Sequence, residues 1–372
     1  MKYKLSDISN YVKGKIDVST LNEDTYISTE NMAPNKGGIT KASSLPTATQ
    51  TQSFAVGDIL VSNIRPYFKK IWFAEYDGGC SNDVLVLRAN EGISKRFLYY
   101  VLANDAFFDY SMATSKGTKM PRGDKTAIME YEVPKFTYDE QEKIAGILAA
   151  LDKKIQLNNA INKNLEQQAQ AIYQQMFIDN PNSDWIEGSL SYIADIIMGQ
   201  SPNGSSYNED RIGTIFFQGR AEFGFRFPTI RLYTTEPKRM ARANDTLMSV
   251  RAPVGDINVA HTDCCIGRGL AAIHSKTNHQ SFVLYTMYSL KKQLDVFNGE
   301  GTVFGSINRN SLNDMSILIP SNEAIEEFER IVAPMDAAIR NNYDEICRLQ
   351  AIRDSLLPRL MSGELDVSDT DL

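Results

Sequence analysis

The sequence predicts an α+β protein built as a tandem duplication, with two mixed α/β domains joined by two long antiparallel coiled-coil helices about a pseudo-twofold axis. Apolar residues between Asp139 and Phe177 recur in alternating steps of four and three over more than four heptads, which is the coiled-coil period. A second stretch, Ala324–Met361, aligns to Glu140–Phe177 without gaps. A long helix gains most of its stability from packing its apolar face. We therefore expect each helix to bury its seam against the other.

An asparagine interrupts the apolar seam at the same place in both helices. Asn158 matches Asn342 in the gapless alignment. A polar seam residue lowers stability but fixes register and partner orientation, and two unrelated amphipathic helices would rarely share one. The predicted seam consists of Ile144, Leu148, Leu151, Ile155, Asn158, Leu165 and Ile172 in the first helix and Val332, Met335, Ile339, Asn342, Ile346, Leu349 and Leu356 in the second.

The globular parts repeat as well. Asp245–Ser249 resembles Asp58–Ser62, and an Arg and a Pro follow closely in both copies. The predicted organisation is a first domain over residues 1–134, a helix over 135–178, a second domain over 179–320, and a second helix with a tail over 321–372.

Within each domain the same order of elements is expected. The first domain is predicted to contain a short helix (Lys4–Gly14), strands (Asp58–Ile64, Ile71–Ala74 and Val84–Leu87), an aromatic-rich helix (Phe97–Ala106), a polar loop (Ser115–Asp124) and a last strand ending at Val133-Pro134. The second is predicted to repeat the short helix (Leu190–Met198), the aromatic-rich helix (Phe282–Leu290), the polar loop (Gly301–Arg309) and the end at Ile319-Pro320.

Bulk composition is that of an ordinary globular chain of 372 residues, with 42% hydrophobic and 23% charged residues. The sequence contains neither an apolar run long enough to span a membrane nor a signal-peptide core near the N-terminus. The four cysteines, Cys80, Cys264, Cys265 and Cys347, are irregularly spaced, which suits a reducing compartment. These observations predict a cytoplasmic protein with no membrane partner.

The net charge of −7 would argue against a nucleic-acid partner if it were spread evenly. Residues 321–372 carry 5 basic and 12 acidic residues, a balance of −7, whereas residues 1–135 carry 17 and 15. Residues 179–320 carry 13 and 14. Each globular domain is thus near neutral and can present a local basic face.

Two equivalent domains on paired antiparallel helices form an arrangement suited to a split DNA site, because protein symmetry and half-site spacing mirror each other. Four stretches carry a resemblance to a known family: YEVPKFTYDEQEKIAGILAALDKKI (Tyr131–Ile155), ILIPSNEAIEEFERIVAPMDAAI (Ile317–Ile339), RLMSGEL (Arg359–Leu365) and MGQSP (Met198–Pro202). They resemble the conserved regions of specificity subunits of Type I restriction-modification enzymes. The resemblance extends over the whole chain, although the first domain lacks a clear Gly-x-Ser/Thr-Pro element.

The resemblance implies two target recognition domains separated by conserved spacer helices. It also implies double-stranded DNA as a partner, a bipartite, gapped and asymmetric site, and helices that dock two methyltransferase subunits, which a restriction subunit can join. In that family the specificity subunit has no catalysis of its own. The adenine-specific methylation, the S-adenosylmethionine and any endonuclease activity belong to the partner subunits, so no cofactor is expected in this chain.

Residues for DNA contact are sought among Arg, Lys, Asn and Gln in loops, because the cations neutralise phosphates and read guanine while the amides read adenine. The predicted set in the first domain is Asn63, Arg65, Tyr67, Lys69, Lys70, Lys116, Thr118, Lys119 and Arg122, and in the second Gln200, Gln218, Arg220, Arg251, Arg268, Ser306, Asn308 and Arg309. Any one of them taken alone is equally well a solvated surface residue. Arg122 and Arg309 are favoured most, because the offset that relates Asp58–Ser62 to its copy also relates these two arginines, and both lie in the predicted polar loops.

Catalytic motifs are sought and not found in the sequence, which has no P-loop, no Asn-Pro-Pro-aromatic tetrapeptide and no placeable Ser/His/Asp set. His261 with Cys264 and Cys265 suggests a metal site, but adjacent cysteines chelate poorly. Core or strand positions are therefore the preferred interpretation, with no metal expected. His274 and His279 are interpreted as loop residues.

Two other classes of function stay open. One is a coiled-coil adaptor whose domains bind proteins. The other is an enzyme with its own methyltransferase or nuclease domain, which the missing motifs disfavour. A salt-sensitive affinity for duplex DNA would count against the adaptor.

Overall fold

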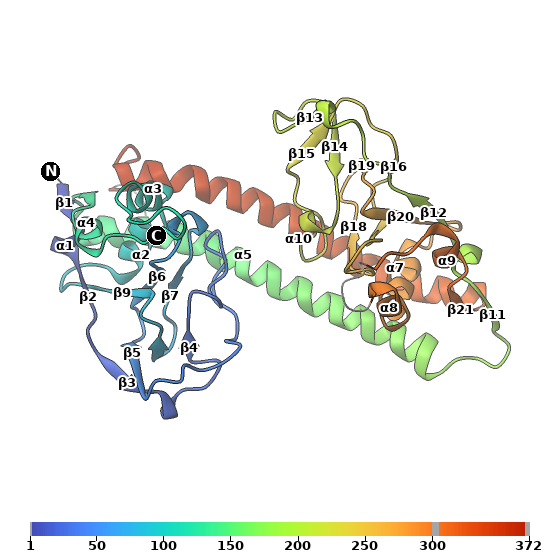
Figure 1. Ribbon diagram of the computed structural model, residues 1–372, viewed down its shortest axis with the longest axis horizontal. Coiled ribbons are helices and arrows are strands. Elements are labelled where there is room, and N and C mark those ends of the chain that lie inside the picture. Colours follow the sequence, from blue (N-terminus) through green and yellow to red (C-terminus); the bar gives the residue numbers. More distant parts are fainter. Residues whose placement is uncertain (1, 300–304, 369–372) are drawn as a thin grey trace. The chain divides into compact units, whose positions relative to one another are not determined.

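The structure is a computed structural model that describes residues 2–299 and 305–368. The chain divides into two compact units, the first formed by Met1–Leu157 with Glu345–Leu372 and the second by Asn158–Asp344. Each unit contains one globular head and one segment from each of the two long helices, α5 (Tyr138–Tyr173) and α10 (Asn322–Ser362) (Figure 1).

The first head consists of short strands and four short helices. Its elements are β1 (Lys2–Lys4), α1 (Leu5–Ile8), β2 (Ser9–Tyr11), β3 (Lys15–Asp17), β4 (Tyr26–Ile27), β5 (Gln50–Phe54), β6 (Ile59–Ser62), β7 (Ile71–Phe73), β8 (Gly78–Cys80), β9 (Val84–Ala89), α2 (Lys95–Ala103), α3 (Asp105–Ala113), α4 (Lys125–Met129) and β10 (Glu132–Pro134).

The second head follows a π-helical turn at Gln174–Asp179. Its elements are β11 (Ile186–Ser189), α6 (Leu190–Ile193), β12 (Ala194–Met198), β13 (Tyr207–Asn208), β14 (Thr214–Phe217), β15 (Leu232–Thr234), β16 (Met240–Ala241), β17 (Thr246–Ser249), β18 (Ile257–Val259), β19 (Cys264–Ile266), β20 (Leu270–Ser275), α7 (Gln280–Ser289), α8 (Lys291–Asp295), α9 (Arg309–Asn313) and β21 (Ser316–Ile319).

Sheet topology confirms the duplication. The main sheet of the first head has the strand order β2-β9-β6-β7, and that of the second head has the equivalent order β12-β20-β17-β18, antiparallel throughout. Each head also has a second sheet, β3-β5-β8-β4 in the first and β13-β15-β14-β19-β16 in the second. The strands β5-β8-β4 and β16-β19-β14 pair in the same order and directions, so the second sheets share these three strands and differ at their edges.

Alternating side chains make each head a three-layer structure. In β6, Ile59 and Val61 belong to the core beneath the helices, whereas Leu60 belongs to the core shared with the second sheet of the head. In the second head, Met248 and Leu247 of β17 divide in the same way. A strand of period two that is covered on both faces produces this pattern.

The long helices run antiparallel within each unit. In the first unit Asp152 of α5 pairs with Arg353 of α10 at 2.8 Å, and Lys154 pairs with Glu345 at 3.5 Å. Residue numbers that increase along α5 thus lie opposite residue numbers that decrease along α10, as in an antiparallel pair. All fourteen predicted seam residues are buried or half-buried.

In the second unit the predicted seam residue Asn342 pairs with Asn162, a further asparagine of α5. The Nδ2 of Asn342 donates to the Oδ1 of Asn162 at 2.8 Å, and the Nδ2 of Asn162 donates to the carbonyl of Ile339 at 3.3 Å. Asn158 is buried as well. The polar seam is thus satisfied across the helix pair, as burial of amides requires.

Several element boundaries differ from the prediction. Of the predicted helix Leu190–Met198 only Leu190–Ile193 is helical, because Ala194–Met198 is strand β12 and alternates buried and exposed residues. Lys4–Gly14 divides in the same way into α1 and β2. The predicted helix Phe97–Ala106 breaks at Asn104, whose side chain accepts from the amide of Ala106 and starts α3.

Candidate nucleic-acid interface

Two backbone hydrogen bonds fasten the polar loop of the first head to the turn that follows β6. The amide of Arg65 donates to the carbonyl of Pro121 at 2.8 Å, and the amide of Gly123 donates to the carbonyl of Asn63 at 3.1 Å. The turn and the loop form one surface as a result.

The second head repeats both bonds with other residues. The amide of Ala252 donates to the carbonyl of Gly305 at 3.0 Å, and that of Ile307 donates to Val250 at 3.1 Å. We call this pair of backbone bonds between turn and polar loop the frame. The two heads have the same frame but present different side chains on it.

This frame corrects the predicted alignment of the polar loops. The bonds match Arg65 with Ala252 in the turns and Gly123 with Ile307 in the loops, and the second head is three residues shorter between turn and loop. Arg122 consequently corresponds to Ser306, and Arg309 corresponds to Lys125. The predicted equivalence of Arg122 and Arg309 is wrong.

Arg309 is also not a loop residue, since it begins helix α9 behind the cap Asn308. The side chain of Asn308 accepts from the amide of Ser311 at 2.9 Å, as Asp124 accepts from Thr126 at the start of α4. The part of the predicted loop at 301–304 lies outside the described residues.

Most of the predicted contact residues of the first head lie at the surface. Tyr67, Lys116, Thr118, Lys119 and Arg122 are exposed, Arg65, Lys69 and Lys70 are half-buried, and Asn63 is buried. Among the described residues, neither the Oδ1 of Asn63 nor the Nε of Arg65 has a hydrogen-bond partner, although both atoms are buried. The backbone of Asn63 holds the turn, because its carbonyl accepts from Gly123 and its amide donates to the carbonyl of Asp83 at 2.8 Å.

Acidic neighbours partly neutralise this surface. Arg122 pairs with Asp83 at 3.1 Å, and Lys116 pairs with Asp124 at 2.5 Å. These pairs are solvent-exposed, so each contributes little stability and its cation can exchange its partner for a phosphate.

All eight predicted contact residues of the second head are exposed. They follow the ends of neighbouring strands, and backbone bonds tie those ends together. The amide of Gln200 donates to Ile266 at 3.0 Å, and the amide of Arg268 donates to the Oγ of Ser201 at 3.2 Å. Four strand ends and the polar loop therefore meet at one edge of the head.

Gly199 permits this convergence. A Cβ at this position would lie 2.1 Å from the carbonyl oxygen of Gly267, so no other residue fits. The equivalent residue of the first head is Gly14, where a Cβ would meet the Oγ of Ser53 at 2.4 Å. The first head thus keeps the glycine of the MGQSP element without its Ser-Pro.

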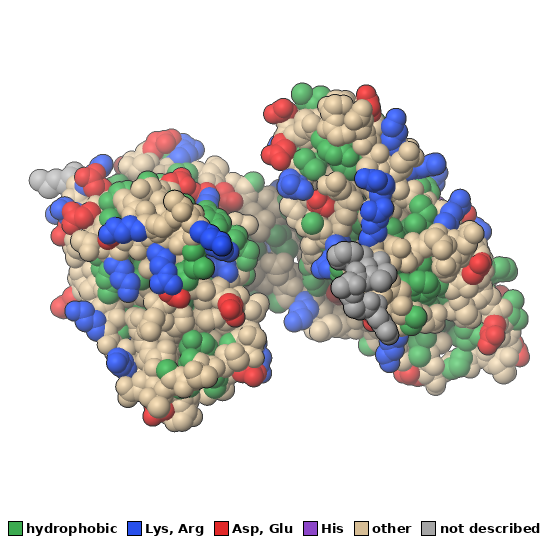
Figure 2. Space-filling view, in the orientation of Figure 1, with side chains coloured by type: hydrophobic (Ala, Val, Ile, Leu, Met, Phe, Trp, Pro, Cys, Tyr) green, Lys and Arg blue, Asp and Glu red, His purple; other side chains and the backbone are tan. Residues whose placement is uncertain are grey.

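Three of the four predicted cations of the second head have no acidic partner among the described residues, compared with three of the six in the first head. Arg251, Arg268 and Arg309 form no ion pair with any residue between 2 and 299 or 305 and 368, whereas Arg220 pairs with Asp256 at 2.9 Å. Figure 2 shows Lys and Arg side chains gathered on the displayed face of this head.

Sequence reasoning missed part of the first surface. Phe68 is exposed beside Tyr67, and Lys36 reaches Asp105 at 2.8 Å together with Lys69 at 2.9 Å. The Asn35–Gly38 turn has an ordinary turn sequence, and nothing in the sequence says that it lies against residues 65–69.

The histidines and cysteines have structural positions. His261 bonds Asp344 at 2.7 Å, and Cys264 and Cys265 are buried in β19. His274 lies in strand β20 and bonds Asp245 at 2.6 Å, so its interpretation as a loop residue is wrong. Within the described ranges no three His, Cys, Asp or Glu side chains are grouped to hold a metal ion.

Comparison with known proteins indicates one family. Residues 1–167 match the Type I restriction modification DNA specificity domain. The chain is 28% identical to the MjaX type I restriction enzyme specificity subunit of Methanocaldococcus jannaschii, over 98% of this chain and 88% of that protein. It is 23% identical to the HindI specificity subunit of Haemophilus influenzae, over 98% of this chain and 99% of that protein. The chain is thus similar to type I specificity subunits over nearly its whole length.

A solved structure agrees on the fold. The specificity subunit of a type I system from M. genitalium superposes with a TM-score of 0.63 at 16% identity, over 97% of this chain and 96% of that one. The predicted architecture of α/β heads with long helices is that of this subunit. The matched specificity domain supports a role of the chain in sequence-specific DNA recognition.

The long helices of this chain retain exposed apolar residues outside the seam. Leu157, Ile161 and Ile352 are 50%, 46% and 47% exposed. Tyr173, at a position outside the predicted seam, is instead buried, with its hydroxyl donating to Thr286 at 3.0 Å. No helix in the described ranges is both long enough and apolar enough to cross a membrane.

Proposed function

We propose that the chain is a specificity subunit, each head of which contacts one half of a bipartite, gapped and asymmetric DNA site. The observation that carries the proposal is the duplicated frame of turn and polar loop, which holds its backbone in one arrangement and changes its side chains. Because base edges are read by side chains, one frame with two sets of residues favours two half-sites of different sequence.

The helices would serve the rest of the complex. Leu157, Ile161 and Ile352 are apolar side chains left outside the intramolecular seam. Such residues suit docking of two methyltransferase subunits, with a restriction subunit as a further partner. Methylation of adenine with S-adenosylmethionine would be the work of those partners.

A map of methylated adenines in the source strain, with and without this gene, tests the proposal. We expect one gapped two-part motif to lose methylation in the deletion strain and to regain it with the wild-type gene. A map that does not change in an active strain would contradict the proposal and favour the adaptor.

Complementation with altered genes sharpens this test. A variant with Arg220, Arg251 and Arg268 changed to Ala should relax or abolish recognition of one half of the motif. A matched variant with Lys116, Lys119 and Arg122 changed to Ala should affect the other half. Identical effects of the two variants on both halves would contradict the assignment of one head to each half-site.

A further inference from the structure

The turn at residues 65–69 of the first head ends in two exposed aromatic rings. Tyr67 is 47% exposed and Phe68 is 37% exposed, although side chains of this size usually bury most of their area. Their ring centroids lie 4.6 Å apart with an interplanar angle of 52°. The pair, which we call the aromatic tip, leaves more than a third of the surface of each residue uncovered by the described part of the chain.

The aromatic tip is held in a strained backbone. Arg65 and Lys69, on either side of the short helical turn Pro66–Phe68, have φ of 49° and 50°. Such left-handed conformations are unfavourable for non-glycine residues and persist only where surrounding structure enforces them. Strain of this kind is common at functional sites.

A second strained turn enforces the first. Asn35 and Lys36 also have positive φ, at 55° and 61°. Their amides donate to the carbonyls of Phe68 and Lys69, each at 2.8 Å. The aromatic tip is therefore a preorganised element fastened along its backbone.

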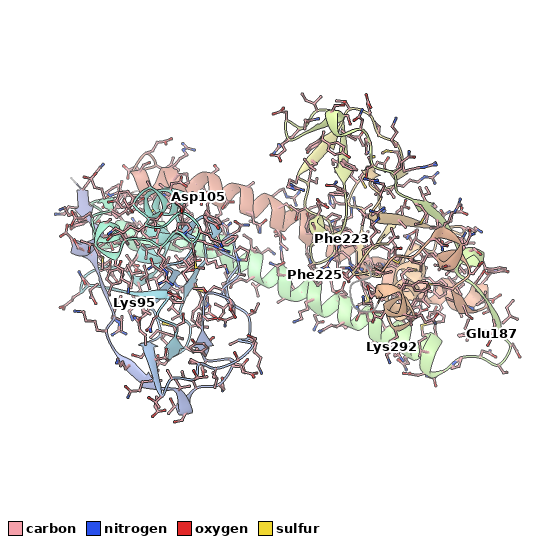
Figure 3. All side chains as sticks on the ribbon, viewed as in Figure 1. Lys95, Asp105, Glu187, Phe223, Phe225 and Lys292 are labelled. Carbon is pink, nitrogen blue, oxygen red and sulfur yellow. The ribbon has the colours of Figure 1, made fainter. Side chains whose placement is uncertain are left out.

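Positive charge surrounds the aromatic tip. The ammonium of Lys70 lies 5.6 Å from the centroid of the Phe68 ring. Lys36 and Lys69 converge on Asp105, labelled in Figure 3 at the start of α3. Partial burial would raise the pKa of Asp105, but the two ammonium groups that share its carboxylate hold that pKa below its usual value. Aromatic rings beside a net positive charge fit DNA better than they fit an apolar protein surface.

The equivalent turn of the second head differs in its side chains and in its charge. It is one residue shorter, because the amides of Ser62 and Ser249 close the two turns by donating to the carbonyls of Lys70 and Asp256. Val254, which is buried, stands where the first head has its two aromatic residues. Asp256 stands where the first head has Lys70, and it pairs with Lys291, at the start of α8, at 3.5 Å.

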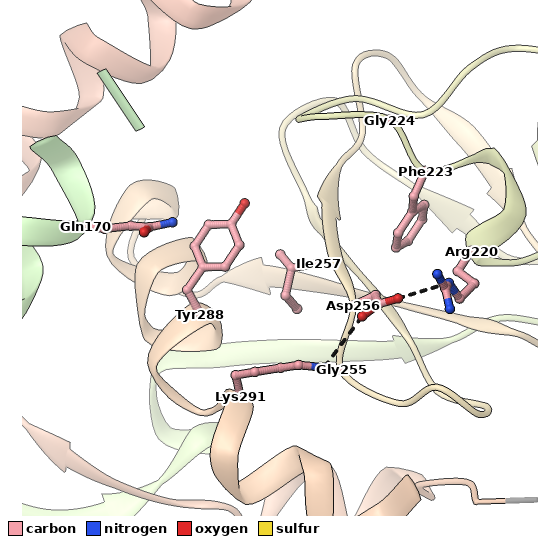
Figure 4. Close-up of a pocket in the computed structure, with 9 residues that line it drawn as sticks. All are labelled: Gln170, Arg220, Phe223, Gly224, Gly255, Asp256, Ile257, Tyr288 and Lys291. Atoms are coloured by element: carbon pink, nitrogen blue, oxygen red, sulfur yellow. Dashed lines mark ion pairs between the residues drawn. The ribbon is translucent and has the colours of Figure 1, made fainter. Parts of the chain in front are cut away.

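A pocket opens where the first head has its aromatic tip. Its volume is about 560 Å³, and Arg220, Phe223, Gly255, Asp256, Tyr288 and Lys291 contribute to its lining (Figure 4). One head therefore projects aromatic side chains at this position, and the other is recessed.

We infer that the aromatic tip of the first head is a wedge that inserts at a base step of the first half-site and unstacks it, whereas the second head reads its half-site without such a wedge. This inference rests on the proposed function. Apolar wedges of this kind kink duplex DNA at flexible steps. DNA shape would then contribute to recognition on one side of the site only.

The test uses duplexes that carry 2-aminopurine, an adenine analogue that brightens when it is unstacked, at successive positions of either half-site. The motif comes from the methylation map, and the protein is the full chain expressed with its methyltransferase partner. The methylated adenines themselves are left unlabelled, because a methyltransferase flips its target base out of the stack without any wedge. At the other positions we expect wild-type protein to raise fluorescence at a step of the first half-site and not at the second.

Variants separate the wedge from simple contact. The double substitution Tyr67→Ala with Phe68→Ala should abolish the fluorescence rise and weaken binding of the cognate duplex about 5- to 150-fold, as expected for loss of stacked aromatic contacts. Phe68→Leu, which keeps an apolar side chain, should retain much of the rise. Phe225→Ala, which removes an exposed aromatic ring from the second head (Figure 3), serves as the matched control and should leave the first half-site unchanged.

Each outcome has one meaning. Tight, motif-specific binding by wild-type protein without any fluorescence rise would overturn the wedge and leave the proposed function intact. Equal binding of cognate and scrambled duplexes would overturn the proposed function itself. Loss of the co-purified methyltransferase from the double-alanine variant would show that the aromatic tip binds protein, and would also overturn the wedge.

Discussion

In each unit an aspartate of a long helix anchors the head, and the two aspartates are equivalent in the duplication. The arginines that pair with them come from different elements. Asp152 in the first unit and Asp336 in the second lie at equivalent positions of α5 and α10, since the alignment that matches Asn158 with Asn342 also matches these two residues. Each accepts a hydrogen bond from a tyrosine of the aromatic-rich helix, Tyr100 at 2.7 Å and Tyr285 at 2.9 Å.

The arginines differ. In the first unit the partner of Asp152 is Arg353, which comes from the opposite long helix and is one-fifth exposed. In the second unit the partner of Asp336 is Arg226, which comes from the head itself, is 3% exposed and pairs at 2.6 Å. The same anchor therefore joins helix to helix in one unit and head to helix in the other.

The second ion pair is the more deeply buried, so its arginine depends more strongly on its carboxylate. The Nη1 of Arg226 has no hydrogen-bond partner among the described residues. Burial disfavours its charge, yet Asp336 and, to a lesser degree, Tyr288, Tyr285 and Glu166 hold the pKa of Arg226 above its usual value. A buried cation of this kind depends on its carboxylate, because a lone buried charge is strongly destabilising.

The largest expected effect follows from this difference. Asp336→Ala should lower the free energy of unfolding of the second unit by about 3–5 kcal/mol, because it leaves Arg226 buried without its main partner. The matched substitution Asp152→Ala should cost the first unit clearly less, since Arg353 is more exposed and also pairs with Asp354 at 2.8 Å. Hydrogen exchange resolved by residue measures both units in one molecule. Equal losses in the two units would contradict the comparison.

Recognition should divide between the heads in the same molecule. Arg122→Ala and Arg251→Ala remove cations from the loop of the first head and the turn of the second. Each should weaken binding by about 1–3 kcal/mol if it reads a base, and only through its own half-site. Binding to duplexes mutated in one half-site at a time measures this. Loss spread evenly over both half-sites would indicate a phosphate contact or a folding defect.

The structure also shows which features of the heads the sequence could predict. The heptad period, the matched Asn158 and Asn342, and the motif at Asp58–Ser62 with its copy at Asp245–Ser249 depend on local patterns, and the corresponding helices and strands lie where expected. The equivalence of Arg122 with Ser306 depends on a small length difference between turn and loop, which no local pattern records.

Arg226 illustrates the same limit for the anchors. In sequence it lies in a Gly-Phe-Arg-Phe-Pro segment that reads as a surface loop, and only the fold brings it to Tyr285 and Asp336. Long-range ion pairs are specified by packing rather than by residue spacing. The sequence predicted only Tyr67 of the aromatic tip. The turn at Asn35 and Lys36 that supports the tip is distant in sequence, so local patterns do not reveal it.

The asparagine pair gives a smaller effect that is confined to the helices of the second unit. Asn162→Leu with Asn342→Leu replaces both partners of a buried hydrogen bond by apolar side chains of similar size, which should raise the unfolding free energy by about 1 kcal/mol. The same change should loosen helix register, since a polar seam residue favours one register. Thermal melting together with cysteine cross-linking at seam positions measures both effects. A lower melting temperature with unchanged register would contradict this role of the asparagines.

The smallest effect concerns the outer carboxylate of the second anchor. Glu166 lies 3.7 Å from Arg226 and accepts from the hydroxyl of Tyr288 at 3.3 Å. Burial raises the pKa of Glu166 above its usual value of 4.5, and the attraction of Arg226 only partly offsets this. A raised pKa means that the folded state disfavours the carboxylate relative to the unfolded state, so the stability contributed by Glu166 is fully present below about pH 4.5 and is lost as the pH rises through the raised pKa.

Glu166→Gln should therefore change stability by about 1 kcal/mol or less at neutral pH and should remove part of the pH dependence. We expect the wild type to gain stability relative to the variant as the pH falls below neutrality towards 4.5. Denaturant unfolding of both proteins between pH 4.5 and 8 measures the difference, and Glu327→Gln, at an exposed position of α10, is the matched control. A variant that is least stable relative to the wild type at neutral pH would mean that the carboxylate supports the anchor. Arg226 would then depend on two carboxylates, and the contrast between the two heads would be larger than their aspartates alone indicate.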